Sequence, residues 1–402
     1  MIDTAVFALV AAGVVITIGF FGNYMFRRTG FPDMLILIGL GVLLGPVLKL
    51  FDPSGVVALA PYMSALALVF ILFDGGLSMN IYQVFSASPR AVLLASTGFL
   101  LSVLSVTAVM YYLFAIPFLY ALLFGTTFGG SSSVIVIYLA QRIGVSEQCS
   151  IVVSLESALT DILCIVISLA IIEIIQTGQA EYLIITQQIA SRFATGAVVG
   201  VLLGVFWLWG LPRLIKEPYS YMLTLAIVIF AYSISEYLGG SGALSSLCFG
   251  LVLGNEKEIY GMLKRNVGFK LVDKKMKRFE SEITFLVRTF FFVYLGLIAT
   301  FSEIGFLFMG IIISCVLFLV RFVAVYIGTW HSELKKESFI MSTLIARGLA
   351  AAVLATLPLQ LKLLYADTFV NLAIIVIMLT AMICTVSLFL FSRKSKRKTP
   401  RS

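Results

Sequence analysis

The sequence predicts an all-α membrane protein with thirteen transmembrane helices, arranged as two inverted six-helix repeats. Of its 402 residues, 60% are hydrophobic and 12% are charged, whereas a soluble domain carries about 25% charged residues. The hydrophobic residues gather into runs of about 20, the length of helix that crosses the hydrocarbon core. These runs lack the alternation of a transmembrane β-barrel. The basic residues concentrate in alternate connecting segments, as a multi-span chain requires.

Apolar runs bounded by glycine, proline and charged residues define thirteen expected spans. With the N-terminus outside the cell membrane, the cytoplasmic segments hold 22 of the 28 lysines and arginines, and the external segments hold three. The positive-inside rule therefore predicts an external N-terminus and a cytoplasmic C-terminus. The spans lie near 3–26, 32–50, 56–78, 91–114, 117–141, 150–173, 186–210, 219–237, 241–254, 283–301, 304–328, 338–360 and 367–391.

Two basic segments are expected on the cytoplasmic face. Residues 256–280 space apolar side chains among lysines, which predicts an amphipathic helix on the membrane surface. Residues 393–402 form a basic tail that we expect to contact lipid headgroups of the bilayer rather than nucleic acid. The five cysteines are scattered and His331 is the single histidine, so we expect no structural metal, disulfide framework or other cofactor.

Two carboxylates lie deep in the sixth span, where an ionisable group costs at least about 2.5–3.5 kcal/mol. Ser157 and Asp161 are four residues apart and share a helix face, whereas Glu156 points to a different one. We predict that Glu156 forms a structural ion pair with Arg347. Asp161, beside Ser157 and Thr160, is predicted to hold a cation or a proton in turn. The other two intramembrane arginines, Arg288 and Arg321, are expected to reach the membrane surface or to pair with a nearby glutamate. The nearby glutamates are Glu280 and Glu282.

Two spans carry signals of an interrupted helix. The fifth reads 121-ALLFGTTFGGSSSVIVIYLA, and the twelfth contains Ala346-Arg347-Gly348. Backbone groups freed inside a bilayer need hydroxyls, water or an ion as partners, and many transporters build ion sites this way. If spans 1–6 and 8–13 are two halves, each interruption occupies the fifth helix of its half. Span 7 then inverts the second half, which predicts crossed discontinuous helices in spans 5 and 12.

Four stretches resemble the sodium/proton exchanger family, and within it the NhaP-like antiporters of archaea and bacteria. They read 32-PDMLILIGLGVLLGP, 125-GTTFGGSSSVIV, 155-LESALTD and 346-ARGLAAAVLA. The resemblance implies that the site is completed by Ser157 and by groups of the fifth span, here Thr127, Ser131 and Ser132. It pairs the glutamate with the twelfth-span arginine. It also implies a homodimer, with scaffold spans about 1–78 and 186–301 and moving core spans about 91–173 and 304–391.

The resemblance implies exchange of Na⁺ or Li⁺ for H⁺ by alternating access, with no cofactor beyond the transported ions and no enzymatic activity. Electroneutral members usually have Asn-Asp where this chain has Thr160-Asp161. A single carboxylate favours one-for-one exchange, but threonine lacks the amide and leaves K⁺/H⁺ antiport as an alternative. Sodium-coupled symport of an organic anion is a further alternative. A channel would need more polar residues along the remaining spans.

Overall fold

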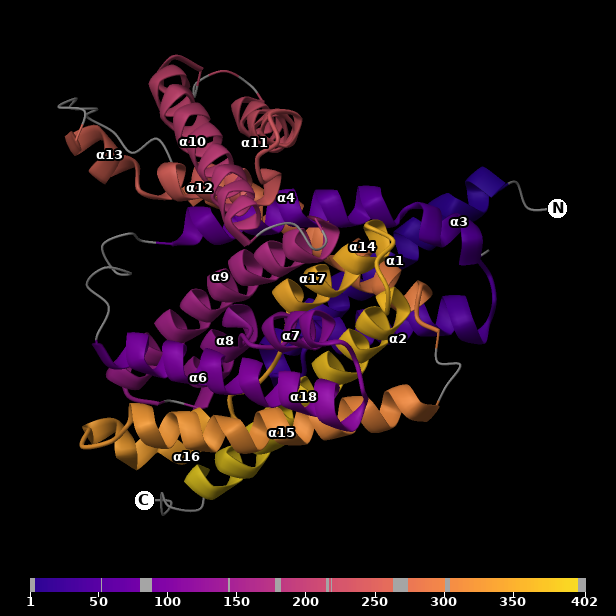
Figure 1. Ribbon diagram of the computed structural model, residues 1–402, viewed down its shortest axis with the longest axis vertical. Helices are drawn as coiled ribbons and strands as arrows, with labels where there is room; N and C mark the ends of the chain where they lie inside the picture. Colours follow the sequence, from indigo (N-terminus) through magenta and orange to yellow (C-terminus); the bar gives the residue numbers. More distant parts are fainter. Residues whose placement is uncertain are drawn as a thin grey trace. The chain divides into compact units, whose positions relative to one another are not determined.

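The computed structural model describes residues 4–51, 53–79, 89–143, 145–177, 182–214, 217, 219–262, 274–300 and 304–396, and within them every regular element is helical (Figure 1). The helices are α1 Thr4–Thr29, α2 Asp33–Val42, α3 Pro53–Ala58, α4 Ala60–Ser78, α6 Pro89–Ala108, α7 Phe118–Thr127, α8 Ser133–Ile143, α9 Glu147–Thr177, α10 Tyr182–Leu214, α11 Ser220–Tyr237, α12 Gly242–Gly254, α13 Glu256–Met262, α14 Lys274–Leu297, α15 Ile304–Gly328, α16 Ser338–Thr343, α17 Leu349–Gln360 and α18 Ala366–Lys396. Short π-helical turns follow α2 and α6, and a 3₁₀ turn precedes α16: Leu43–Val47, Val109–Leu113 and Glu333–Glu337.

Each of the thirteen expected spans overlaps a helix or a consecutive pair of helices. Among the described residues, eight helices are long and apolar enough to cross a membrane, and shorter apolar helices accompany them. The all-helical, multi-span membrane class is thus confirmed. The total of thirteen crossings, the inverted repeat and the orientation of the termini stay predictions.

Both expected interruptions are present. The helix of the fifth span ends at Thr127 and resumes at Ser133, and that of the twelfth ends at Thr343 and resumes at Leu349. The glycines and hydroxyl side chains of the fifth span therefore mark a real gap in the helix, as the sequence indicates.

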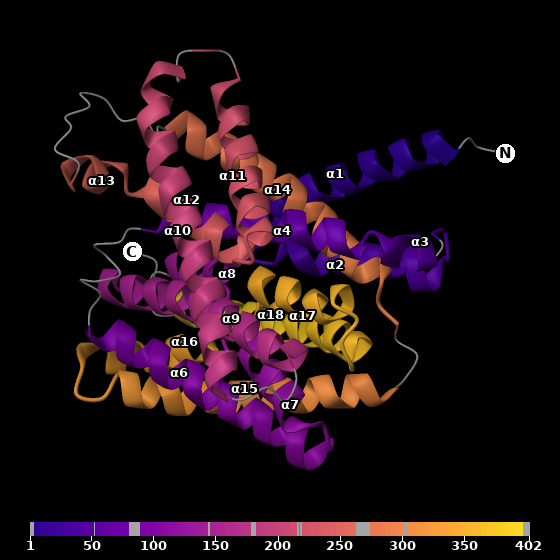
Figure 2. The same cartoon turned by 45° about the horizontal axis from the view of Figure 1, so that its top comes forward.

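Contacts divide the chain into two compact units. The first comprises Met1–Pro61, Ala87–Ile175 and Thr289–Ser402, and the second comprises Tyr62–Ser86 and Gln176–Arg288. In the first unit, α6 packs along α15, and α17 along α18 (Figures 1 and 2). This division groups residues 1–61 with the expected moving core. Which spans move and which form the scaffold stays a prediction, because contacts alone do not report motion.

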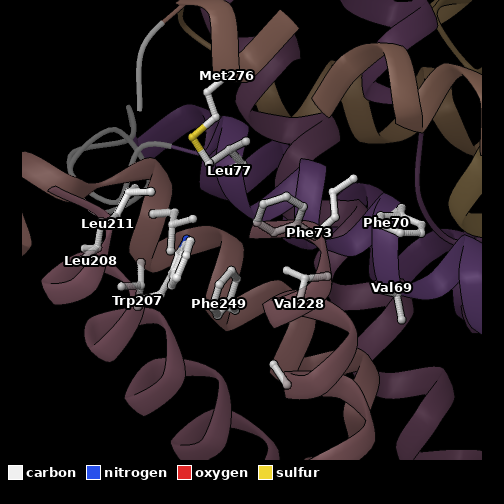
Figure 3. Packing of buried hydrophobic residues seen from close by; sticks show 14 of the residues in the cluster. Val69, Phe70, Phe73, Leu77, Trp207, Leu208, Leu211, Val228, Phe249 and Met276 are labelled. Carbon is white, nitrogen blue, oxygen red and sulfur yellow. The ribbon is translucent and has the colours of Figure 1, made fainter. Parts of the chain in front are cut away.

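The second unit has its own apolar core, contributed by α4, α10, α11, α12, α13 and the first turns of α14 (Figure 3). Helices α4 and α12 approach backbone to backbone. A Cβ on Gly76 would lie 2.3 Å from the carbonyl oxygen of Leu247, and one on Gly250 would lie 2.2 Å from that of Phe73. Small residues at such contacts allow helices in membranes to pack closely.

The surface helix expected over 256–280 stays a prediction, because the structure describes only its two ends. Helix α13 ends at Met262, residues 263–273 lie outside the described residues, and 274–280 are the opening turns of α14, which continues into the tenth span. Met276 is fully buried in the apolar core of the second unit, beside Leu77 (Figure 3). In the described start of α14, Met276 thus faces protein rather than lipid. Of the basic tail, α18 includes the first residues through Lys396, and the rest lies outside the described residues.

Candidate functional site

Helix α9 carries the two carboxylates of the sixth span in one uninterrupted helix. The Ser146 hydroxyl accepts a hydrogen bond from the backbone N–H of Cys149 at 3.2 Å and so caps the first turn. Further along, Glu156 and Ser157 are buried, and Asp161 is half-buried one turn beyond Ser157. The helix-face argument therefore holds, with Ser157 and Asp161 on one side.

The first helix gap lies against α9. The backbone N–H of Ser131 donates to Thr160 Oγ1 at 3.3 Å, and the Ser131 hydroxyl donates to Glu156 Oε1 at 3.3 Å. The same hydroxyl lies 2.9 Å from the hydroxyl of Ser157. At Gly130 an added Cβ would come within 3.0 Å of the Thr160 carbonyl oxygen, so only glycine lets the gap approach α9 this closely. Ser131 thereby joins three of the expected site residues.

The second gap finds its backbone partners on α18. The N–H groups of Ile345 and Ala346 donate to Cys384 Sγ at 3.2 and 3.1 Å, and the N–H of Arg347 donates to Thr380 Oγ1 at 3.0 Å. These contacts satisfy amides that the missing helical turn would otherwise leave buried without an acceptor.

The two gaps touch each other. The backbone N–H of Ser132 donates to the carbonyl oxygen of Ala346 at 2.7 Å. A Cβ at Gly348 would lie 2.3 Å from Ser132 Oγ. The two discontinuous helices therefore meet at Ser132 and Gly348, next to the Ser131–Thr160 contact, as a crossing of the two would require.

The expected ion pair between Glu156 and Arg347 is wrong, because Glu156 pairs with Arg321 of α15 instead. The guanidinium donates from Nη1 to Oε1 at 2.8 Å and from Nη2 to Oε2 at 2.9 Å. Its third donor, Nε, reaches the carbonyl oxygen of Met341 at 3.2 Å. Both charged side chains are buried. This two-pronged geometry is the strongest form of an arginine–carboxylate pair, and it ties α9, α15 and α16 together.

Arg347 has a different partner for its charge. Its Nη1 donates to the carbonyl oxygen of Gly130, a group freed by the first gap, while Nε is buried without a hydrogen-bond partner. Arg347 also lines a cavity of about 10 Å³ together with Ser131, Glu156 and Arg321, room for about one water molecule. The arginine of the second gap thus supports the backbone of the first.

The remaining expected site residues sit around this crossing. Ser132 takes part through its backbone, and its side chain packs against Gly348. Thr127 ends α7 with its hydroxyl buried and without a hydrogen-bond partner. Thr160 accepts from Ser131 and donates to the Ser157 carbonyl oxygen at 3.1 Å. Ser131, Ser132, Glu156, Ser157 and Thr160 therefore meet at one place. Asp161 follows Thr160 along α9, and the structure gives Thr127 no bond to the others.

Sequence reasoning missed three contributors. Arg321 carried a signal, since a guanidinium deep in the apolar run 304–328 needs a buried partner. Thr380 and Cys384 carried none, because a hydroxyl or thiol in an apolar helix normally bonds within its own helix. Only the packing of α18 against the second gap turns them into acceptors.

The family follows from the whole chain. A model of the transmembrane sodium/hydrogen exchanger family matches residues 12–394. The chain belongs to the sodium/hydrogen exchanger family. Among solved structures, the sodium proton antiporter MjNhaP1 from Methanocaldococcus jannaschii at pH 8 superposes with a TM-score of 0.77 at 20% identity, covering 96% of this chain and 98% of the other. That likeness shows a shared fold.

Two curated exchanger relatives differ in the ion they are named for. The K(+)/H(+) antiporter NhaP2 of Shewanella sp. (strain ANA-3) is 29% identical over 387 residues, 93% of this chain and 64% of the relative. The Na(+)/H(+) antiporter NhaH of Halobacillus dabanensis is 25% identical over 348 residues, 82% of this chain and 84% of the relative. The chain thus spans about 64% of the length of the NhaP2 relative.

Proposed function

We propose that this exchanger-family chain is a secondary active antiporter that exchanges Na⁺ or Li⁺ for H⁺ by alternating access, with Asp161 binding cation and proton in turn. The observation that carries the proposal is the position of Asp161. It is half-buried on α9, one turn beyond Ser157 and next in sequence to Thr160, which accepts a hydrogen bond from Ser131 of the first gap. Gaps of this kind supply hydroxyl and carbonyl oxygens to a partly dehydrated cation.

The charges of this site favour one-for-one exchange. It contains two carboxylates and two guanidiniums, and Glu156 is held by Arg321 in a bidentate pair. A proton or a monovalent cation on Asp161 adds the same single positive charge. The two loaded states therefore carry equal charge, and their crossing moves no net charge in a complete cycle. Because Glu156 is paired with Arg321, Asp161 is the carboxylate that exchanges cation for proton.

K⁺/H⁺ exchange is the second candidate, favoured by the name of the more similar curated relatives. Thr160 stands where an amide side chain is usual in electroneutral Na⁺ exchangers, and its hydroxyl is engaged by Ser131 and the Ser157 carbonyl. A site without the amide side chain holds its surroundings less rigidly, which leaves room for K⁺, the larger of the two ions. Because the chain spans part of the length of these relatives, the ion is assigned by experiment on this chain itself.

The test is transport by purified protein in liposomes that contain a pH-sensitive dye, with Na⁺, Li⁺ and K⁺ added in turn. We expect a dye response to Na⁺ and Li⁺, lost in Asp161→Asn and retained in Asp367→Asn, the same substitution at an exposed aspartate. A response to K⁺ alone supports the second candidate. No response to any cation from folded protein overturns antiport and favours anion symport.

Competition between cation and proton gives a pH prediction. A protonated Asp161 cannot bind the cation, so lowering the pH below the pKa of the site should raise the apparent KM for the cation about tenfold per pH unit. Above that pKa the rate should fall because few protons remain to be exchanged. Transport rates from pH 5 to 9 at several cation concentrations check this, and a pH-independent KM contradicts it.

A further inference from the structure

A cavity of about 570 Å³ opens at the end of the first unit where α6 and α9 begin and α15 ends. Its volume lies within the range of about 300–1,000 Å³ that is usual for ligand sites. Figures 1 and 2 show the start of α6 beside the end of α15. The transport site does not contribute to its wall, which consists of Arg90, Gln148, Tyr326, Thr329, Trp330, His331, Ser332, Glu333, Lys335 and Ser338.

The wall is held in place by hydrogen bonds between segments far apart in the chain. Arg90 Nη2 donates to the carbonyl oxygen of His331 at 3.2 Å. The Ser146 backbone N–H and hydroxyl donate to the two carboxylate oxygens of Glu337 at 2.8 and 2.7 Å. These bonds fasten the 329–337 turn to the first turns of α6 and α9. The cavity is thus a built feature rather than a gap between loose loops.

The charges of the wall favour an anion. Arg90 lines the cavity and brings one positive charge to its wall, and its Nη1 is buried without a hydrogen-bond partner. Lys335 adds a second positive charge. The single acidic side chain, Glu333, accepts a hydrogen bond from Lys336 at 2.7 Å, and this contact holds the pKa of its carboxyl below the usual range. The carboxylate is thereby balanced by its own neighbour.

The neutral part of the wall suits a phosphate group on an organic body. Ser332 and Ser338 bring hydroxyl donors, and Gln148 lies in the opening turn of α9, where helix N–H groups favour negative charge. Tyr326 and Trp330 meet edge to face with centroids 5.1 Å apart, and both remain more than half exposed. Such amphipathic rings sit at membrane–water interfaces. The wall thus combines phosphate donors with a surface for an apolar or ring-shaped body.

We infer that this cavity binds a phosphate-bearing anion through Arg90 and Lys335, with Trp330 against the body of the ligand. Two sources share that chemistry: the headgroup of an anionic phospholipid, and a soluble organic phosphate. The inference is independent of the ion that the protein transports, and its test therefore measures binding alone.

Trp330 supplies the signal. The chain has two other tryptophans, both in α10, so Trp207→Phe with Trp209→Phe leaves Trp330 as the single emitter. The full-length protein in detergent is titrated with short-chain phosphatidylglycerol, short-chain phosphatidylcholine and pyrophosphate. We expect a saturable change in Trp330 emission with phosphatidylglycerol or pyrophosphate. Phosphatidylglycerol alone identifies a lipid headgroup, and pyrophosphate alone a soluble phosphate. An equal response to zwitterionic phosphatidylcholine overturns the anion site.

Variants complete the test. Arg90→Ala and Lys335→Ala should each weaken binding at least about tenfold, because each removes charge-assisted hydrogen bonds to the phosphate. Lys257→Ala removes the same charge from an exposed lysine that does not line the cavity and should bind like the parent. Arg90 also bonds to the carbonyl oxygen of His331, so Arg90→Ala risks unfolding the protein. Lys335 is exposed and does not make that bond, so Lys335→Ala remains a valid test if Arg90→Ala unfolds. Unchanged binding by Lys335→Ala overturns the inference.

Discussion

At the scale of single residues, the Glu156–Arg321 pair is the most consequential contact of the first unit. Both side chains are buried, and removing one partner leaves the other charge without compensation. We expect Arg321→Met or Glu156→Gln to lower the free energy of unfolding by about 3–5 kcal/mol. The double variant should lose less than the sum of the two. Unfolding of detergent-solubilised protein by heat or denaturant measures this double-mutant cycle.

The matched control is the arginine that the sequence favoured. Arg347→Met combined with Glu156→Gln should show a much weaker coupling, since Arg347 donates to the Gly130 carbonyl and not to the carboxylate. A coupling of Glu156 to Arg347 as strong as its coupling to Arg321 would contradict the observed pairing. The two cycles therefore separate a direct ion pair from shared proximity to one small cavity.

At the scale of elements, helix packing depends on a few glycines that touch another helix. Adjacent positions that face open space tolerate a larger residue. Gly76 of α4 touches the backbone of α12, where an added Cβ would lie 2.3 Å from the Leu247 carbonyl oxygen. The adjacent Gly75 has no heavy atom within 4 Å of such a Cβ. We expect Gly76→Ala to destabilise the protein by about 1–3 kcal/mol, because two backbones must separate.

Gly75→Ala is the internal control and should be neutral or stabilising by up to about 1 kcal/mol, since alanine is the better helix former. The midpoint of heat-induced unfolding in one detergent compares both with the parent. Equal midpoints for the two variants would mean that α4 and α12 are not in backbone contact.

The elements were predictable where the signal is local. An interrupted helix is predicted by the glycines and hydroxyl residues at 125–133 and by Arg-Gly at 347–348. Both gaps are present in the structure. The partner of Glu156 was not predictable, because it depends on which of several apolar helices packs against α9. Lysine-spaced apolar residues near Met276 predict a membrane surface helix, whereas Met276 itself is buried against protein. Composition cannot distinguish lipid from an apolar protein neighbour.

At the scale of the whole molecule, connecting segments that the charge argument places on the same side of the membrane contact one another. Contacts join Arg90 to His331 and Ser146 to Glu337, three segments that follow the third, fifth and eleventh expected spans. Odd-numbered spans all end on the same side if the count between them is right. The packing of the first unit thus agrees with the alternation on which the charge argument depends. The homodimer implied by the resemblance stays a prediction.

The predicted orientation can be tested across the interrupted twelfth span, where a crossing is least obvious from length. Lys336 precedes this span and Leu364 follows it, and both side chains are more than 60% exposed. Lys336→Cys and Leu364→Cys are treated in cells with a membrane-impermeant maleimide, before and after permeabilisation, with the parent chain as background. We expect Leu364→Cys to react in intact cells and Lys336→Cys only after permeabilisation. The reverse pattern would invert the orientation, and reaction of both from one side would mean that the two short helices enter and leave the membrane on the same face.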